Sequence, residues 1–236
     1  MKSRYKRVCI KLSGEVFAGK PGFGFDHEVI DTLARQIKRI CGLGVRVGLV
    51  VGGGNIFRGG GSAPEGMDRV AGDHMGMLAT VINAIYLQDS LERIDLETRV
   101  LTAFEVRAIA EPYIKRRMVR HFEKRRAVIF AGGTGNPFFT TDTAAALRAS
   151  EMSAEILIKG TKVDGVYDKD PMLHTDARRF DKLSYQEVLG RDLRVMDATA
   201  VAFCKDNRIP ILVLNIEQKD SLYDAITGKD VGTLVS

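Results

Sequence analysis

The sequence predicts an α/β fold in which helices cover both faces of a mostly parallel central sheet. Short apolar runs, typical of buried strands, alternate along the chain with longer segments of helical character. Glycine-rich or polar turns directly follow four of these runs, and open parallel sheets bind ligands at that end of their strands. The chain has 236 residues, 45% of them hydrophobic and 28% charged, which is enough for one globular domain with a large core.

Strand and helix signals alternate from the beginning of the chain. The apolar run over Tyr5–Lys11 predicts a first strand, and the glycine-rich stretch Ala18–Phe25 predicts a loop. Asp26 is a typical N-cap for the helix that follows. Apolar residues recur in that helix at helical spacing until Gly42 ends it.

The same alternation continues through the middle of the chain. Val45–Val51 predicts a second buried strand, and a loop with six glycines follows it. A long helix is expected over Ala71–Glu92, with Asp73 in its first turn. Arg99–Ala103 predicts a third strand and Ile114–Arg126 a basic helix. Four methionines are expected in the core: Met75, Met77, Met152 and Met196.

The stretch from residue 126 to 155 organises the rest of the chain. The apolar run Ala127–Ala131 precedes three glycines, and Thr140, Thr141 or Asp142 is the start signal of an alanine-rich helix. A strand, a glycine-rich loop and a helix N-terminus together bind anions, because backbone N–H groups and the helix dipole favour negative charge. Asp142 would repel phosphates unless it orients cationic groups or a metal; alternatively it is only an N-cap.

The last third of the chain completes the pattern. Strands are expected over Glu155–Lys159 and Pro210–Asn215, helices over Asp197–Asn207 and Asp220–Thr227, and an edge strand over Gly232–Val235. After the first of these strands, a tyrosine at 167 could stack on a base and an aspartate at 170 could accept from a ribose hydroxyl. We expect one domain with two lobes, about residues 1–154 and 155–236.

Two cationic residues lie where a phosphate could bind. Lys11, in KLSG, ends the first strand, and Arg58 lies in the glycine-rich loop after the second. A lysine can reach a transferring phosphoryl group, and an arginine can donate two hydrogen bonds to phosphate oxygens. Either residue taken alone is as well explained by a solvated surface, so the prediction rests on their placement beside glycine turns.

Two familiar nucleotide-binding motifs are incomplete here. Gly14–Lys20 matches the first seven positions of the phosphate-loop motif GxxxxGK[ST], but Pro21 replaces the hydroxyl residue. In the dinucleotide motif GxGxxG, Phe57 replaces the third glycine. Neither a phosphate-loop fold nor a dinucleotide site is therefore expected.

Composition limits the class of protein. The net charge of +5 permits nucleic-acid binding, but equally a substrate with several phosphates. Cys9, Cys41 and Cys204 lie far apart in apolar segments, as core residues in a reducing compartment do. No secretory leader and no apolar run of about 18 residues is present, so we expect a cytoplasmic protein without a membrane span. His74 and His121 lack metal-ligand spacing, so no protein-held metal is expected.

Six segments occur in one order along the chain: KLSGE, VGGGNIFRG, GDHMGMLAT, GGTGNPFFTTD, KVDGVYDKDP and RVMD. Together they make the chain, from about residue 5 onwards, resemble the bacterial uridylate kinases of the amino acid kinase family. The resemblance implies a three-layer α/β/α sandwich of the carbamate kinase-like type. It also implies reversible, ATP-dependent phosphorylation of UMP to UDP in pyrimidine nucleotide (CTP) biosynthesis, with Mg²⁺ carried on ATP as the cofactor.

The resemblance also implies roles for individual residues. The catalytic residues would be Lys11, Arg58 and Asp142, since the aspartate organises active-site lysines in the wider family. The ATP-binding residues would be Lys11, Leu12, Ser13, Gly14, Gly54, Arg58, Thr161, Tyr167 and Asp170. The UMP-binding residues would be Gly53, Asp73, Thr134, Gly135, Asn136, Pro137, Phe138, Phe139, Thr140 and Thr141. Lys162 and Asp197 lie in similar motifs, and their roles stay open.

Regulation is implied by the resemblance as well. Relatives are hexamers that are typically activated by GTP and inhibited by UTP, with the GTP site between subunits. We therefore expect a homohexamer with ATP and UMP as substrates and these two effectors, and no nucleic-acid or membrane partner. The residues that match the GTP-linked segment and arginines are Gly19, Lys20, Pro21, Gly22, Phe23, Gly24, Arg99 and Arg126.

Three alternatives stay open. A kinase for another acid or for carbamate would have the same fold, and the phosphate-suited loop TGNPFFTT argues against it. A non-catalytic nucleotide-binding or storage protein would release no ADP with UMP and ATP, and the presence of Lys11 and Asp142 argues against it. A nucleic-acid binder would be retained on DNA at near-physiological salt, but the aromatic and basic interleaving of an RNA module is missing.

Overall fold

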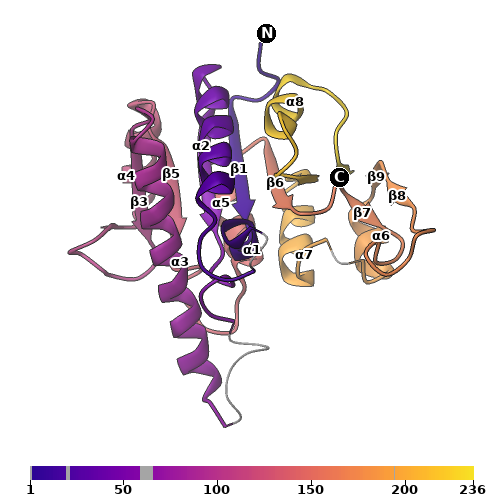
Figure 1. Ribbon diagram of the computed structural model, residues 1–236, viewed down its shortest axis with the longest axis horizontal. Coiled ribbons are helices and arrows are strands. Elements are labelled where there is room, and N and C mark those ends of the chain that lie inside the picture. The colour runs from indigo at the N-terminus through magenta and orange to yellow at the C-terminus, as the bar shows by residue number, and fades with distance from the viewer. Residues whose placement is uncertain (1, 20–21, 59–65, 194) are drawn as a thin grey trace.

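The molecule is built on one large β-sheet. The structure is a computed structural model, which describes residues 2–19, 22–58, 66–193 and 195–236. The strands of this sheet are β1 (Arg7–Leu12), β2 (Arg46–Val51), β3 (Thr98–Thr102), β4 (Glu111–Pro112), β5 (Ala127–Ala131), β6 (Ile156–Thr161), β9 (Lys182–Leu183), β10 (Ile211–Asn215) and β11 (Thr233–Val235). Their order is β4–β3–β5–β2–β1–β6–β10–β11–β9 (Figure 1). A separate pair joins β7 (Val166–Tyr167) to β8 (Arg179–Phe180).

The sheet is mostly parallel, as the sequence predicted. Every neighbouring pair runs parallel except β10 and β11, which are antiparallel. The expectation that the chain ends in an edge strand is wrong, because β11 lies between β10 and β9. The strand β9 was not predicted, since two residues are too short to show a periodic pattern.

Helices cover both faces of the sheet (Figure 1). They are α1 (Gly14–Ala18), α2 (His27–Gly42), α3 (Arg69–Glu92), α4 (Lys115–Glu123), α5 (Thr141–Glu151), α6 (Tyr185–Gly190), α7 (Ala198–Asp206) and α8 (Ser221–Thr227). One hydrophobic core contains side chains of α2, α3 and α8, and the other contains side chains of α4, α5, α6 and α7. The predicted α/β/α sandwich is therefore confirmed. Among the described residues, no helix combines the length and apolar character that crossing a membrane requires.

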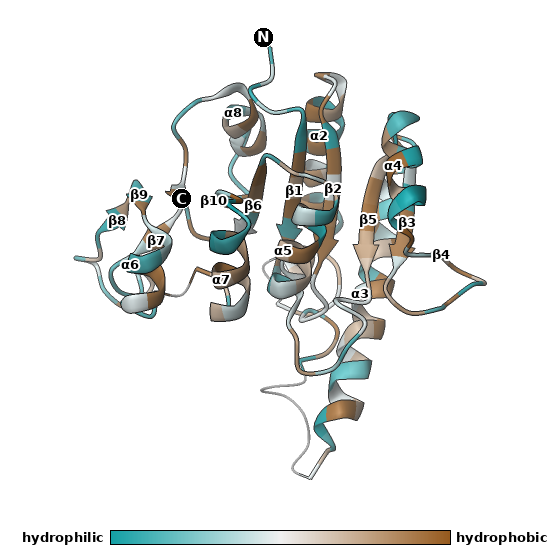
Figure 2. Cartoon of the chain, turned by 180° about the vertical axis from the view of Figure 1, so that it is seen from behind, coloured by the Kyte–Doolittle hydropathy of each residue, from teal (hydrophilic) through white to brown (hydrophobic). Residues whose placement is uncertain are grey.

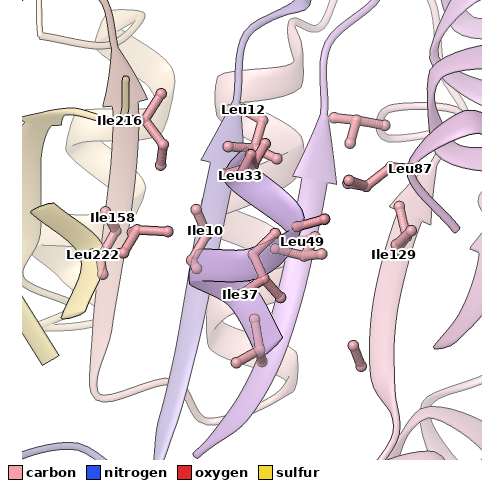
Figure 3. Close-up of a cluster of buried hydrophobic side chains, with 14 of the residues drawn as sticks. Ile10, Leu12, Leu33, Ile37, Leu49, Leu87, Ile129, Ile158, Ile216 and Leu222 are labelled. Carbon is pink, nitrogen blue, oxygen red and sulfur yellow. The ribbon is translucent and has the colours of Figure 1, made fainter. Parts of the chain in front are cut away.

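Successive side chains of a strand point alternately into the two hydrophobic cores. In β1, Val8, Ile10 and Leu12 point toward the core under α2, and Cys9 points toward the core under α5. Figure 3 shows Ile10 beside Ile37 of α2 in the first of these cores. Because both faces are buried, the central strands read in sequence as continuous apolar runs.

The helix boundaries follow side-chain caps. The Asp26 carboxylate accepts from the amide of Val29, and the Asp68 carboxylate accepts from that of Ala71. The long helix α3 therefore begins two residues earlier than predicted, and Asp73 lies in its second turn. The short helix α1 was not predicted, because five residues show too little periodicity.

An exposed apolar stripe runs along α3. Met75, Leu78, Ile82 and Ile85 are 42%, 49%, 48% and 38% exposed. The prediction that Met75 lies in the core is therefore wrong, although Met152 and Met196 are buried as predicted and Met77 is half-buried. Figure 2 shows that α3 projects well beyond the ends of the strands. By helical spacing, the stripe lies on the face of α3 opposite the core residues Ala84, Leu87 and Leu91.

Candidate active site

The carboxyl ends of four neighbouring parallel strands lie side by side. The strands β5, β2, β1 and β6 are consecutive in the sheet. Each is followed by a turn that the sequence singled out, and these turns begin near Gly132, Gly52, Ser13 and Lys162. Four segments that are far apart in the sequence therefore meet at one edge of the sheet, as expected for a ligand site.

A buried carboxylate joins two lysines at this edge. Lys11 and Lys159 are register partners on β1 and β6, so their side chains leave the same face of the sheet. Asp142 lies in the first turn of α5, which covers that face. Its Oδ1 is 2.7 Å from Lys11 Nζ and its Oδ2 is 2.9 Å from Lys159 Nζ.

This cluster carries one net positive charge in a site that water hardly reaches. Burial alone would raise the pKa of Asp142, but the Lys11 and Lys159 ammonium groups outweigh it and hold that pKa below its ordinary value. Burial lowers the pKa of Lys159, an effect that the Asp142 carboxylate opposes and the Lys11 ammonium strengthens. The excess positive charge and the N-terminus of α5 both favour an anionic ligand.

The beginning of α5 is fixed by hydrogen bonds from two directions. Thr140 is its N-cap, and its hydroxyl accepts from the amides of Asp142 at 3.0 Å and Thr143 at 3.4 Å. Asp197 caps α7 by accepting from the amide of Ala200 at 2.7 Å. The same carboxylate accepts from the hydroxyl groups of Thr140 and Thr143. Asp197, whose role the sequence left open, therefore ties the N-termini of α5 and α7 together and helps to place Asp142.

The turns after β1 and β2 are in direct backbone contact. A Cβ atom at Gly14 would lie 2.3 Å from the amide nitrogen of Gly54 and 2.7 Å from that of Asn55, so no larger residue fits. The carbonyl of Leu12 accepts from the amide of Gly52 at 2.7 Å. The Leu12 side chain is fully buried, so only its backbone can take part in the site.

Arg58 and Ser13 lie at the same two turns. Arg58 donates from Nε to the Gly54 carbonyl at 3.2 Å, and its guanidinium pairs with the carboxylate of Glu15. Half of the Arg58 side chain is exposed. Ser13 is the N-cap of α1, but within the described residues its hydroxyl caps no amide of that helix. Both side chains are therefore placed at the turn where the sequence predicted them.

A cavity of about 140 Å³ lies between α3 and the loops after β2 and β5. The predicted UMP-binding residues that line it are Gly53, Asp73, Asn136, Phe139, Thr140 and Thr141. Gly53 lies so close to α3 that a Cβ atom there would be 2.8 Å from the carbonyl oxygen of Gly76. The Asp73 carboxylate accepts from the amide of Phe138 at 2.7 Å, which joins the helix to the loop at the cavity wall.

The remaining predicted UMP-binding residues lie outside the cavity lining: Thr134, Gly135, Pro137 and Phe138. The Thr134 hydroxyl accepts from the amide of Asn136 at 3.2 Å inside the loop. Gly135 has a φ of 83°, and a Cβ atom there would lie 3.1 Å from the carbonyl of Ala103. The Phe138 side chain is 64% exposed. Thr134 and Gly135 therefore shape the loop.

Comparison with known proteins decides the family, since the sequence profile of the amino acid kinase family matches residues 6–215. The chain belongs to the amino acid kinase family. Its structure is similar to a UMP kinase from Bacillus anthracis, with a TM-score of 0.94 and 39% identity over 98% of this chain and 96% of that chain. A UMP kinase from Ureaplasma parvum gives a TM-score of 0.92 and 37% identity over 99% of both chains.

A uridylate kinase from Archaeoglobus fulgidus is similar as well. It gives a TM-score of 0.75 and 28% identity over 97% of this chain and 99% of that chain. The resemblance to bacterial uridylate kinases that the six sequence segments indicated is confirmed by the two bacterial structures.

In this member of the amino acid kinase family, a larger cavity of about 490 Å³ lies beyond β6. Tyr167 and Asp170, which the sequence analysis assigned to ATP binding, both line it. The Tyr167 hydroxyl donates to Asp164 at 2.5 Å, and this bond raises the pKa of the tyrosine. Thr161 does not line the cavity. Its hydroxyl donates to the carbonyl of Val163 at 2.6 Å and so shapes the turn.

The predicted effector residues lie in two places. Gly19, Gly22, Phe23 and Gly24 belong to the segment between α1 and α2, and Lys20 and Pro21 lie outside the described residues. Lys162 donates to the carbonyl of Gly19 at 2.7 Å, which links this segment to the turn after β6.

The two arginines lie near the β4 side of the sheet. Arg99 lines a cavity of about 410 Å³ together with Arg107 and Arg117. Arg126 lies beyond the end of α4, donates to Glu97 at 2.7 Å and contacts the His121 ring at 3.4 Å. The hydrogen bond from Arg126 holds the pKa of Glu97 below its ordinary value.

Sequence reasoning missed Lys159 as a partner of Asp142. Part of its signal was present, because two predicted strands, Tyr5–Lys11 and Glu155–Lys159, each end in a lysine. Only the register of β1 against β6 shows that the two side chains share one carboxylate. The pairing of Arg58 with Glu15 was missed because it joins α1 to the loop after β2, two segments that lie far apart in the sequence.

Proposed function

We propose that this chain transfers the terminal phosphoryl group of ATP to UMP, which gives UDP in pyrimidine nucleotide biosynthesis. The observation that carries the reaction type is the Lys11–Asp142–Lys159 cluster. Asp142 directly follows the threonines that line the smaller cavity, and Lys159 lies on the strand that leads to the larger one. The choice of UMP rests on the similarity to the UMP kinases.

The mechanism that we propose is positioning with charge neutralisation. Phosphoryl transfer needs the attacking and leaving oxygens in line and the charge on the transferring oxygens stabilised. Lys11 and Lys159 bring ammonium groups to the buried edge, and the turns at Gly14 and Gly54, which contact each other, follow β1 and β2 at the same edge of the sheet. Arg58 would reach the phosphates by exchanging its exposed contact with Glu15 for a bidentate one.

Asp142 acts on the lysines rather than on a metal. Its two oxygens are each taken by one ammonium group, which leaves it poorly suited as a metal ligand. Mg²⁺ is commonly bound through substrate phosphates with few protein carboxylates, so we propose that it enters with ATP. It would supply additional neutralisation of the phosphate charge.

The smaller cavity is the proposed UMP site. Asp73 is the residue that would accept from the ribose, and Thr141 at the start of α5 would donate its hydroxyl to the phosphate. The hydroxyl of Thr140 is already donated to Asp197, so Thr140 would contribute its backbone. Asn136, on the loop between β5 and α5, also lines the cavity and would contact the base edge. A polar base edge that leaves such groups unpaired is strongly disfavoured, so UMP should be preferred over CMP.

The proposal divides the work between two parts of the chain. Residues 1–154 would supply the UMP cavity and the phosphate turns, and residues 155–236 would hold the nucleoside of ATP. Self-association and effector binding are part of the same proposal: a homohexamer that GTP activates and UTP inhibits. The heptad-like spacing of Met75, Leu78, Ile82 and Ile85 supports association through α3.

A coupled ADP-release assay tests the function. ATP is offered with UMP, CMP, N-acetylglutamate or carbamate, and only UMP is expected to give rapid release. Release with carbamate or acetylglutamate would mean another kinase of the same family. No release with any acceptor, although UMP and ATP bind, would mean a nucleotide-binding protein without catalysis.

A further inference from the structure

We propose that Asn55 and Asn83 are positioning residues for phosphoryl transfer, through which α3 fixes the backbone of the turns after β1 and β2. The proposal rests on the proposed function for its kinetic part only. Neither side chain belongs to the predicted substrate-binding set, and both are completely buried. They act through the backbone that they hold.

The two amide side chains form a closed pair. Asn55 Nδ2 donates to Asn83 Oδ1 at 3.0 Å, and Asn83 Nδ2 donates to Asn55 Oδ1 at 2.7 Å. Each uses its second N–H on a main-chain carbonyl: Asn55 on Gly24 at 2.8 Å, and Asn83 on Gly52 at 2.6 Å. All four N–H groups of the pair are therefore used, which fixes both side-chain orientations.

One of the two carbonyls held by this pair, that of Gly52, belongs to the proposed phosphate site, and the other, that of Gly24, lies in the segment between α1 and α2. Gly52 begins the turn after β2, and its amide bonds the last residue of β1. The backbone of Asn55 itself lies against Gly14, where a Cβ atom would be 2.7 Å from the Asn55 nitrogen. Shifting the pair would therefore move the two turns that contact each other at the proposed phosphate site.

The same face of α3 also reaches the loop after β5. The Thr80 hydroxyl accepts from the amide of Gly132 at 2.7 Å, and Asp73 accepts from the amide of Phe138. Asn83 lies three residues after Thr80, about one helical turn further along this face. One rigid helix therefore sets the spacing between the loops on either side of the proposed UMP cavity.

A buried amide pair is a poor choice if only stability is at stake. Replacing both partners of a buried hydrogen bond by apolar groups of similar shape is often neutral for stability. A pair of leucines makes no directional hydrogen bonds, so it cannot hold the carbonyls of Gly52 and Gly24 in one orientation. The pair therefore gives the turns a defined position, and a small displacement of reacting groups lowers turnover strongly.

The test compares Asn83→Leu, Asn55→Leu and the double variant with wild type. We expect kcat with UMP and ATP to fall roughly tenfold to a hundredfold in each variant, with either KM changed by less than about threefold. The double variant should be no slower than the worse single variant, because the two residues act as one unit. Ser90→Ala is the matched control: Ser90 is buried in the same helix, but its hydroxyl donates to Tyr86 of that helix.

Melting temperature and hydrogen exchange are measured on the same proteins. Faster exchange at the amides of Gly24 and Gly52 in Asn83→Leu, with the β1 amides unchanged, supports positioning and needs no activity. Wild-type protein that lacks UMP-dependent ADP release contradicts the proposed function but leaves this exchange result decisive. Unchanged kcat and unchanged exchange in the double variant overturn the proposal. A loss of kcat that follows only a general loss of melting temperature overturns it as well.

Discussion

Asp142 holds together two lysines whose charges would otherwise repel each other. The ion pairs at 2.7 and 2.9 Å keep Lys11 and Lys159 side by side on neighbouring strands. An anionic phosphoryl group that arrives at this edge meets two ammonium groups and only one carboxylate. At the scale of single residues, the cluster therefore has one excess positive charge, which a negative ligand would neutralise.

Removing Lys11 tests where this charge is used. Lys11→Ala should lower kcat by roughly a hundredfold or more and change the KM for UMP little, because the charge is needed most as the phosphoryl group transfers. Steady-state kinetics with UMP and ATP measure both constants. Lys38→Ala, on the exposed face of α2, serves as a control with normal kinetics. A variant that raises only KM would reduce Lys11 to a binding residue.

The lowered pKa of Lys159 predicts an alkaline limit to turnover. Burial disfavours the charged form, so Lys159 loses its proton at a lower pH than an ordinary lysine, whose pKa is about 10.4. The kcat should therefore fall as the pH rises through a value below about 10.4. In Lys159→Arg, the guanidinium stays charged, so the fall should move to higher pH even if kcat is smaller. An alkaline limb that is the same in both proteins would assign it to another group.

At the scale of elements, α5 brings its first turn to the lysines because small residues face the sheet. Ala144, Ala145, Ala146 and Ala149 are all buried, which lets the helix lie close to β1. The Cys9 thiol donates to the carbonyl of Ala145 at 3.7 Å, a direct contact between that strand and the helix. Larger side chains would lift the helix and pull Asp142 away from Lys11 and Lys159.

One face of the helix α3 contacts the candidate site, and another face is apolar and exposed. Asp73, Thr80 and Asn83 bond the loops of the candidate site, and the exposed stripe from Met75 to Ile85 has no cover among the described residues. Soluble proteins commonly bury such stripes against a partner. A second copy of the chain would then contact the same helix that bonds the loops of the candidate site.

Introducing a charge into the stripe tests this association. Ile82→Glu should keep the fold, because the side chain is 48% exposed, but it should lower the assembled mass, since a carboxylate would be buried in the contact. Sedimentation gives the mass as a multiple of the 26.0 kDa chain. Thr32→Glu adds the same charge to α2 and should leave the mass unchanged. An unaltered mass for Ile82→Glu would place the interface elsewhere.

At the scale of the whole molecule, one sheet connects the candidate site to the predicted effector residues. Arg126 precedes β5, which leads into the loop that lines the smaller cavity of the candidate site. It contacts His121, which in turn lies 3.3 Å from Glu111 at the wall of the cavity that Arg99 lines. A triphosphate bound near these arginines could therefore bias the loop at the end of β5, if it binds one state better.

Replacing Arg126 tests whether this arginine couples effector binding to the loop after β5. The variant should keep basal activity and assembled mass, because Arg126 contacts none of the proposed catalytic residues, and it should lose most of the activation by GTP. Activity at subsaturating UMP with and without GTP measures the effect. Arg35→Ala on α2 is a surface control. Full activation of Arg126→Ala would place the effector elsewhere, and a wild type that ignores GTP would show that this regulation is absent.

The sequence by itself determined the order of the main elements, the parallel sheet and most of the candidate site. Buried strands are apolar throughout, helices repeat at their own period, and turns that contact phosphate need glycine, so all three leave local signals. Lys11 and Asp142 were predicted because each lies beside such a turn. The short strands β4, β7, β8 and β9 left no such signal, since two residues cannot show a period.

Only the tertiary structure decided which groups meet. Lys159 faces Asp142 because of the register between β1 and β6, and Asn55 meets Asn83 because α3 crosses the turn after β2. The apolar character of Met75 had suggested the core, but α3 turns Ala84, Leu87 and Leu91 toward the core and leaves the face of Met75 exposed. These contacts join residues that lie far apart in the chain, so they depend on how whole strands and helices pack and not on local sequence.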